Sequence, residues 1–175
     1  MSNTHLQKQQ RFMALYEPVH ARLARYIRSM VWNEHQAKDL MSETVLIAYE
    51  KLDEVRNMDA FVYFLFGIAS RLIHNNRRKY SKQASLEQVP EPVSMASGPE
   101  ARLHVADLYY ALGLLPSEQR EAVTLFEISG FSLAEIQQMQ GASLSAVKSR
   151  LSRGRQRLAE IMQADEKRIS NQPIV

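Results

Sequence analysis

The chain has 175 residues, of which 45% are hydrophobic and 23% are charged, and its formal net charge is +3. Cysteine is absent, which excludes a disulfide scaffold, a thiol nucleophile and a cysteine zinc site. The sequence contains no apolar run long enough to span a membrane, and its polar N-terminus lacks the apolar segment of a signal peptide. We therefore expect a cytoplasmic protein.

Helical periodicity runs through the first half of the chain. Apolar residues recur at spacings of three and four from Phe12 to Met30, from Ala37 to Leu52 and from Phe61 to Leu72, which predicts amphipathic helices. Pro18 must begin or kink a helix. No segment shows the sustained alternation of apolar and polar residues that is typical of strands, so we expect an all-α fold.

The periodicity ends between Ser81 and Pro99, a segment with three prolines, one glycine and four serines. Such a composition buries too little apolar surface to offset the entropy cost of ordering it, which predicts a flexible linker. We expect two small helical domains, residues 1–80 and 101–163. The linker would cover residues 81–100, and a flexible tail would cover residues 164–175.

The second domain contains signals for two helices separated by a short turn. They follow a predicted helix over residues 118–128. Ser132, with Glu135 three residues later, is typical of a capping box at the start of a short helix. Gly141 predicts a tight turn, and Ser143 is a cap for a longer helix. This order predicts a helix-turn-helix.

The second helix of this motif is expected to have an apolar and a basic face. Its inner face would hold Val147, Leu151, Gly154 and Leu158. Five basic residues and no acidic residue lie between Gly141 and Leu158. Lysine and arginine reach phosphates and guanine edges, and serine bonds either kind of group. We therefore predict DNA binding through Ser145, Lys148, Ser149, Ser152 and Arg153.

The stretch from Leu115 to Leu158 resembles region four of the extracytoplasmic-function (ECF) sigma factors, which are promoter-recognition subunits of bacterial RNA polymerase. The family pattern L-P-x-x-x-R-E, then E-I, G and V-K-S-R-L-x-R, is matched by Leu115, Pro116, Arg120, Glu121, Glu135, Ile136, Gly141, Val147, Lys148, Ser149, Arg150, Leu151 and Arg153. The resemblance implies that the helix-turn-helix reads the minus-thirty-five promoter element.

Four sites depart from the family pattern. Gln137 and Gln140 stand where the family has Ala and Leu, Ser145-Ala146 replaces Gly-Thr, and Gly154 replaces Ala. We expect looser packing of the motif at these positions.

Asp39-Leu40-Met41-Ser42-Glu43-Thr44 resembles the D-L-V-Q-E-T motif in region two of the same family. The resemblance implies docking on the clamp helices of the polymerase's largest subunit. Helical spacing also places Leu46 among acidic residues, in a stripe opposite the apolar stripe that runs from Met41 to Leu52. A basic partner surface with an apolar notch would be complementary to it. The candidate docking residues are Asp39, Ser42, Glu43, Leu46 and Glu50.

The segment Phe61-Val62-Tyr63-Phe64-Leu65-Phe66-Gly67-Ile68-Ala69 resembles the family's F-x-x-W-L-x-x-I-A, and Arg77-Arg78 matches its terminal R-R. The resemblance implies that this part melts and reads the minus-ten element. We expect Phe61, Phe64 and Leu65 in the core, and Tyr63 and Phe66 at the surface. The candidate contacts are Tyr63, Phe66, Arg71, Asn75, Arg77 and Arg78. Arg71 and Asn75 replace an Asn and an Asp of the family.

The resemblance implies three partners: core RNA polymerase, promoter DNA and an anti-sigma protein, often membrane-bound. We expect no small-molecule substrate, cofactor or metal. An enzyme is the first alternative. However, none of the five histidines is paired at ligand spacing, and G-x-x-x-x-G-K, G-x-S-x-G and G-x-G-x-x-G motifs are absent. We expect no catalytic residues.

Two further alternatives share the DNA-binding motif. A regulator of another type, such as a two-component output protein, would need an N-terminal receiver or ligand pocket, and the helical N-terminal half does not favour one. A sigma-like decoy would bind an anti-sigma protein without activating promoters. Run-off transcription with core polymerase separates such a decoy from a true sigma factor.

Overall fold

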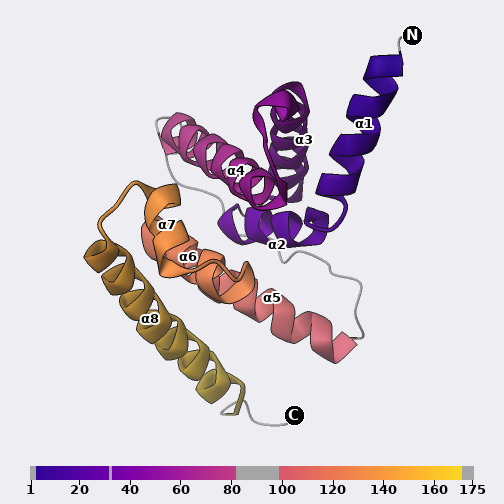
Figure 1. Cartoon of the computed structure of the whole chain (residues 1–175). Coiled ribbons are helices and arrows are strands. Elements are labelled where there is room, and N and C mark those ends of the chain that lie inside the picture. Colours follow the sequence, from indigo (N-terminus) through magenta and orange to yellow (C-terminus); the bar gives the residue numbers. More distant parts are fainter. Residues whose placement is uncertain (1–2, 32, 82–98, 171–175) are drawn as a thin grey trace. The chain divides into compact units, whose positions relative to one another are not determined.

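The computed structural model describes residues 3–31, 33–81 and 99–170. Within these ranges every regular element is helical and no strand occurs (Figure 1). The chain divides into two compact units, Met1–Val89 and Pro90–Val175. The predictions of an all-α fold and of two small helical units are therefore confirmed.

The first unit begins with α1 (Asn3–Tyr16) and α2 (His20–Met30). Pro18 lies between the two helices, as its missing N–H and restricted φ require. Helix α1 begins well before Phe12, the first residue of the apolar pattern, because its first turns are polar and carry little periodicity. The apolar face of α2 is buried through Leu23, Tyr26, Ile27 and Met30.

Helices α3 (Glu34–Glu50) and α4 (Met58–Ser81), joined by the short 3₁₀ helix η1 (Leu52–Glu54), complete this unit. Asn33 caps α3, since its side-chain oxygen accepts a hydrogen bond of 2.7 Å from the His35 N–H. Helix α4 packs against both α3 and α2. The fully buried side chains of the unit include Leu23, Leu40, Leu52, Phe61, Leu65 and Ile73, and each contributes about 1.5–3 kcal/mol through burial.

The buried face of α3 differs from the predicted one. Met41 and Val45, which were placed on the core stripe, are only half-buried. The residues that α3 buries are Ala37, Leu40, Thr44 and Ala48. Helical spacing alone did not decide whether the stripe with Met41 and Val45 or the adjacent stripe with Leu40 and Thr44 faces the core. The packing of α2 and α4 against α3 buries the second stripe.

Phe66 also lies differently from the prediction, which placed it at the surface. Its side chain has no exposed area. Its ring centroid is 5.3 Å from that of Tyr26, and the Arg22 guanidinium carbon is 5.4 Å from the same ring. The prediction was wrong because α4 contacts two helices and therefore buries a wider face than one apolar stripe. Phe64, expected in the core, is half-buried.

The elements of the second unit are α5 (Pro99–Gly113), α6 (Ser117–Val123), the π-helical turn η2 (Thr124–Ile128), α7 (Leu133–Gln140) and α8 (Leu144–Ser170). The single helix predicted over 118–128 thus changes from α to π geometry after Val123. The Ser129 N–H donates to the Thr124 carbonyl at 2.9 Å. The core joins α5, α6 and α8 through Leu112, Leu115, Ala122, Val123 and Leu151.

The helix-turn-helix is formed by α7 and α8, as predicted. The Ser132 hydroxyl accepts the Glu135 N–H at 3.3 Å, and the Glu135 carboxylate accepts the Ser132 N–H at 2.5 Å. Gly141 follows α7 with φ 60°, a left-handed conformation that favours glycine. The Ser143 hydroxyl accepts the Ala146 N–H at 3.1 Å at the start of α8. The two caps and the turn therefore form where the sequence placed them.

The predicted linker and tail are partly helical. Helix α4 reaches Ser81, α5 begins at Pro99, and α8 continues to Ser170. Proline fits the first turn of a helix, where its missing N–H would have no intrahelical partner, so α5 starts within the segment that was predicted as a linker. Residues 82–98 and 171–175, the rest of the predicted linker and tail, lie outside the described residues.

Candidate nucleic-acid and protein interfaces

Helix α8 separates a buried face from a polar one. Val147, Leu151 and Gly154 are buried, and Leu158 is half-buried. The predicted DNA-binding residues lie on other sides of the helix: Ser149 is half-buried, and the exposed members are Ser145, Lys148, Ser152 and Arg153. The four exposed residues lie outward as expected, Ser149 does so only in part, and contact with DNA remains a prediction for all five.

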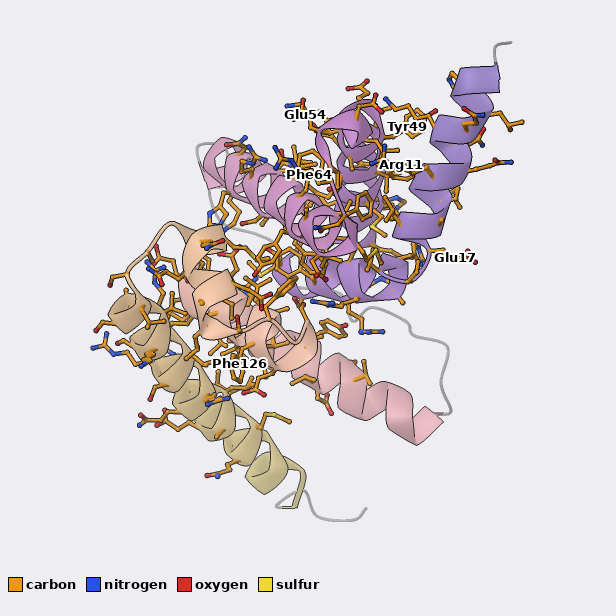
Figure 2. All side chains as sticks on the ribbon, in the orientation of Figure 1. Arg11, Glu17, Tyr49, Glu54, Phe64 and Phe126 are labelled. Atoms are coloured by element: carbon orange, nitrogen blue, oxygen red, sulfur yellow. The ribbon has the colours of Figure 1, made fainter. Side chains whose placement is uncertain are left out.

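Two arginines of α8 are bound within the second unit. The Arg150 guanidinium lies 2.8 Å from the Glu118 carboxylate. Arg155 forms an ion pair with Glu127, and its guanidinium carbon is 5.0 Å from the centroid of the Phe126 ring. Figure 2 shows Phe126 beside α8. These two arginines therefore join α8 to α6 and η2.

The other three basic residues of this segment are Lys148, Arg153 and Arg157. All three are exposed, and they make no ion pair within the part of the chain that the structure describes. Their charges are therefore available to a polyanion. The sequence analysis treated all five basic residues as one block, because the acidic partners Glu118 and Glu127 are distant from α8 in the sequence.

Arg120 and Glu121, which match the R-E of the family pattern, lie inside the second unit rather than at its surface. Arg120 is 9% exposed and Glu121 is 1% exposed. The Arg120 guanidinium donates to the carbonyls of Gly113 and Leu115, the latter at 3.3 Å. These bonds satisfy carbonyls at and just after the end of α5, where no further helical turn supplies N–H donors.

Gln140, at the end of α7, makes hydrogen bonds to both neighbouring helices. Its side-chain nitrogen donates to the Glu118 carbonyl and to the Glu121 carboxylate, each at 3.2 Å. Its side-chain oxygen accepts from the Arg150 guanidinium at 3.0 Å. The expectation of looser packing is wrong at this position, because the amide replaces an apolar contact with directional bonds.

Helix α4 carries a polar surface near its C-terminal end. Arg71, Asn75 and Arg77 are exposed. The Arg71 Nε donates to the Gly67 carbonyl at 3.1 Å, and its two terminal nitrogens make no further hydrogen bond to the described residues. Arg71 and Asn75 are four residues apart and share a face of the helix.

Two aromatic residues lie about two helical turns before Arg71 in α4. Tyr63 and Phe64 are half-buried, and Figure 2 shows Phe64 on α4. Phe66 has no surface on which a base can stack, so the structure removes it from the candidate minus-ten contacts. The side chain of Arg78, another candidate, lies outside the described residues.

The predicted docking stripe on α3 lies at the surface. Leu46 is 57% exposed, and all other members are also exposed: Asp39, Ser42, Glu43 and Glu50. An exposed leucine among carboxylates is suited to a partner that is basic with an apolar notch. The placement is confirmed, and polymerase binding by these residues remains a prediction.

The first turn of α3 is held by a local ion pair. The Lys38 ammonium lies 3.0 Å from the Glu34 carboxylate. Hydrogen bonding to Lys38 holds the pKa of Glu34 below its ordinary value. A negative charge at this end of the helix also interacts favourably with the helix dipole.

One face of α1, whose first turns lie before the apolar pattern that begins at Phe12, packs on Tyr49 of α3. The Phe12 and Tyr49 ring centroids are 5.4 Å apart in an edge-to-face arrangement, and the Lys8 ammonium is 5.4 Å from the centroid of the same Tyr49 ring. His5 is within 3.4 Å of the Tyr49 hydroxyl. His5, Lys8 and Phe12 are spaced by three and four residues, which places them on one face of a helix. This face was not recognised as a packing face because only Phe12 is apolar.

The same helix holds the connection between α3 and α4. Lys8 donates to the Asp53 carboxylate at 2.9 Å and to the Glu50 carbonyl at 3.2 Å. Arg11 donates to the Val55 carbonyl at 2.7 Å. Figure 2 shows Arg11 and Tyr49 where α1 faces α3. Helix α1 therefore holds the C-terminal end of α3 and the segment that follows it.

The described residues contain no group of three or more His, Asp or Glu side chains arranged to hold a metal ion. Over the same ranges, no helix is long and apolar enough to cross a membrane.

Both units match families of known proteins. Residues 15–83 match the family described as Sigma-70 region 2, and residues 106–158 match Sigma-70, region 4. The ECF RNA polymerase sigma factor EcfG of Rhodopseudomonas palustris (strain TIE-1) is 30% identical over 139 residues, which cover 78% of this chain and 77% of that protein. The RNA polymerase sigma factor CarQ of Myxococcus xanthus is 31% identical over 147 residues, 81% of this chain and 83% of that protein.

Solved structures that resemble the chain are also sigma factors. The chain is similar to the sigma factor RpoE, solved in complex with the anti-sigma factor NepR from Bartonella quintana, with a TM-score of 0.70 and 26% identity. That match covers 90% of this chain and 97% of that one. The chain therefore belongs to the ECF subfamily of the sigma-70 factors. It is a transcription initiation factor, which binds core RNA polymerase and directs it to promoters.

Proposed function

We propose that the two units divide promoter recognition between them, with α8 reading the minus-thirty-five element and α4 the minus-ten element. The observation that carries this proposal is the division of charge on α8. Arg150 and Arg155 are neutralised by acidic residues of their own unit, whereas Lys148 and Arg153 extend outward beside three serines. A helix with such a face is suited to the major groove.

The minus-ten contacts are assigned to the polar end of α4. Arg71, Asn75 and Arg77 are exposed there, and Arg78 follows in the sequence. Half-buried Tyr63 lies about two turns earlier on the same helix. An aromatic ring stacks on an unstacked base, and basic side chains hold the displaced backbone. The exposed stripe on α3 is assigned to core polymerase, since its charge complements a basic surface.

Sequencing of the DNA bound by the reconstituted holoenzyme tests this division. The expected result is a motif of two blocks at a constant spacing. Substitution of Lys148 by Ala should alter preferences in the upstream block only, and substitution of Asn75 by Ala should alter the downstream block only. A change in the other block, or no change in either block, would contradict the assignment.

We further propose that an anti-sigma protein holds the free factor inactive. The support is the likeness to RpoE and to CnrH, which were solved in complex with the anti-sigma factor NepR and with the cytosolic domain of CnrY. Each unit also exposes apolar side chains suited to a partner, including Leu46, Tyr110 and Leu114. The factor would act in the cytoplasm, where its polymerase lies, and would catalyse no reaction of its own.

A further inference from the structure

Gln140 occupies the junction of three helices in the second unit. It is the last residue of α7, and Gly141 begins the turn to α8 immediately after it. Its amide nitrogen bonds to Glu118 and Glu121 of α6, and its amide oxygen bonds to Arg150 of α8. One side chain therefore joins both helices of the helix-turn-helix to the helix beneath them.

The chemistry at this junction requires a group that both donates and accepts. Glu121 is 1% exposed and its carboxylate accepts hydrogen bonds. Arg150, whose side chain is 23% exposed, can only donate. A carboxamide satisfies both neighbours, whereas leucine would remove a donor from the buried Glu121 and an acceptor from Arg150. Partly buried polar groups that lose a partner are costly.

The junction bears directly on the outer face of α8. Arg150 adjoins Ser149 in the sequence, and Arg153 follows it by about one helical turn. Arg150 and Arg153 also line one groove with Ser117 and Glu118 at the start of α6. The apolar contacts of Val147 and Leu151 are non-directional. The bonds that Gln140 and Glu118 make to Arg150 are directional and therefore limit rotation of α8 about its axis.

We propose that Gln140 is a positioning residue for promoter recognition, which acts by bridging Glu121 to Arg150 and so fixes the rotation of α8 in the major groove. The inference rests on the proposed function, in which α8 reads the upstream element. Bidentate contacts to bases need placement of donors to within a fraction of an ångström, so a loosened α8 loses discrimination before it loses phosphate contacts. Gln140 itself need not touch DNA.

The experiment compares Gln140→Met with Gln163→Met in the full-length protein assembled with core polymerase. Gln163 is exposed near the other end of α8, so its variant controls for the same chemical change. Two DNAs are compared: one carries the upstream block that the wild-type holoenzyme selects, and in the other that block is scrambled. The measured quantity is the ratio of the affinity for the first DNA to the affinity for the second. Gln140→Met should lower this ratio by about tenfold, a loss typical of a hydrogen bond to a charged group. Gln163→Met should leave the ratio unchanged.

The result also separates this inference from the proposed function. If the wild-type holoenzyme shows no preference for any upstream block, the proposed function fails. If the wild type shows a preference that Gln140→Met retains, the positioning role is overturned and the function stands.

A double-mutant cycle with Arg150→Met tests the bridge even if Gln140→Met lowers the melting temperature. Both substitutions break the bond between Gln140 and Arg150, so the loss of discrimination in the double variant should be smaller than the product of the two single losses. Losses that multiply, as they do for independent sites, would overturn the proposal. Amide hydrogen exchange over residues 144–150 in the free protein supplies a second readout, and faster exchange is expected in both single variants.

Discussion

Gly154 of α8 lies so close to Val123 of α6 that a Cβ atom at position 154 would be 2.6 Å from the Val123 Cγ2 atom and 3.2 Å from the Gln119 carbonyl oxygen. Glycine therefore allows a close approach of the two helices, behind the face proposed to contact DNA. The family pattern has alanine at this position, but here the missing methyl group accommodates a β-branched neighbour. The expectation of looser packing at Gly154 is accordingly wrong.

Gly154→Ala should destabilise the second unit. Alanine gains about 1 kcal/mol of helix propensity over glycine, but overpacking typically costs about 1–3 kcal/mol, and the stiff valine and the backbone carbonyl leave little room to adjust. Amide hydrogen exchange in α8 measures the stability of this unit. Adding Val123→Ala should remove the clash and restore part of the loss.

Gly67 provides the matched control for this prediction. It lies in α4, and a Cβ atom there would meet nothing within 4 Å. Gly67→Ala should therefore stabilise the first unit by roughly 0.5–1 kcal/mol, measured by exchange of the α4 amides. Equal stabilisation by Gly154→Ala in its own unit would show that the contact with Val123 is not restrictive.

Glu43→Lys should weaken binding to core polymerase by at least about tenfold, because a like-charge contact in an interface costs several kcal/mol. Fluorescence anisotropy of the labelled protein with core polymerase measures the affinity. Glu17→Lys makes the same charge change at an exposed residue, which Figure 2 shows at the junction of α1 and α2, and it should bind as the wild type does. Equal affinities of the two variants would place the docking surface elsewhere.

Arg153→Ala should relax base preference in the upstream element, with about 1–3 kcal/mol less discrimination at one or two positions. Arg157→Ala removes the same charge one turn further along α8. It should weaken binding to selected and scrambled DNA alike and flatten the salt dependence of affinity, as loss of a phosphate contact does. Binding titrations at several salt concentrations distinguish the two. If Arg153→Ala behaves like Arg157→Ala, Arg153 contacts phosphate only.

Arg71→Asn should shift the preferred base at one position of the minus-ten element. The bond from Arg71 Nε to the Gly67 carbonyl orients the guanidinium, and its terminal nitrogens offer two donors that match guanine O6 and N7. Asparagine both donates and accepts, and so favours adenine. Selection from a promoter library randomised over the element measures the preference. Reduced activity with an unchanged preference would mean that Arg71 contacts the DNA backbone instead.

Local signals predicted much of this fold. The capping box at Ser132 and the turn at Gly141 depend on residues adjacent in sequence, and both formed as expected. Pro18, which was expected to begin or kink a helix, lies in the turn that separates α1 from α2. The outward face of α8 followed from the period of the helix, because Val147 and Leu151 leave one side without apolar residues. The caps, the turn and the outward face of α8 together form most of the candidate DNA-binding site.

The contacts between distant segments could not be predicted in this way. Phe66 is buried because α2 covers the side of α4 that its own stripe leaves open. The ion pairs of Arg150 with Glu118 and of Arg155 with Glu127 depend on how α6 and η2 lie against α8. A list of charges along the chain gives their number and not their pairing. The polar role of Gln140 was missed for the same reason.

Run-off transcription with purified core polymerase tests the central claim most directly. The template carries both blocks selected by the holoenzyme, and matched templates have one or the other block scrambled. We predict a discrete transcript that depends on this protein and is strongly reduced when either block is scrambled. If the protein binds core polymerase but produces no transcript from any template, it is a sigma-like decoy rather than a promoter-reading factor, and the account is contradicted.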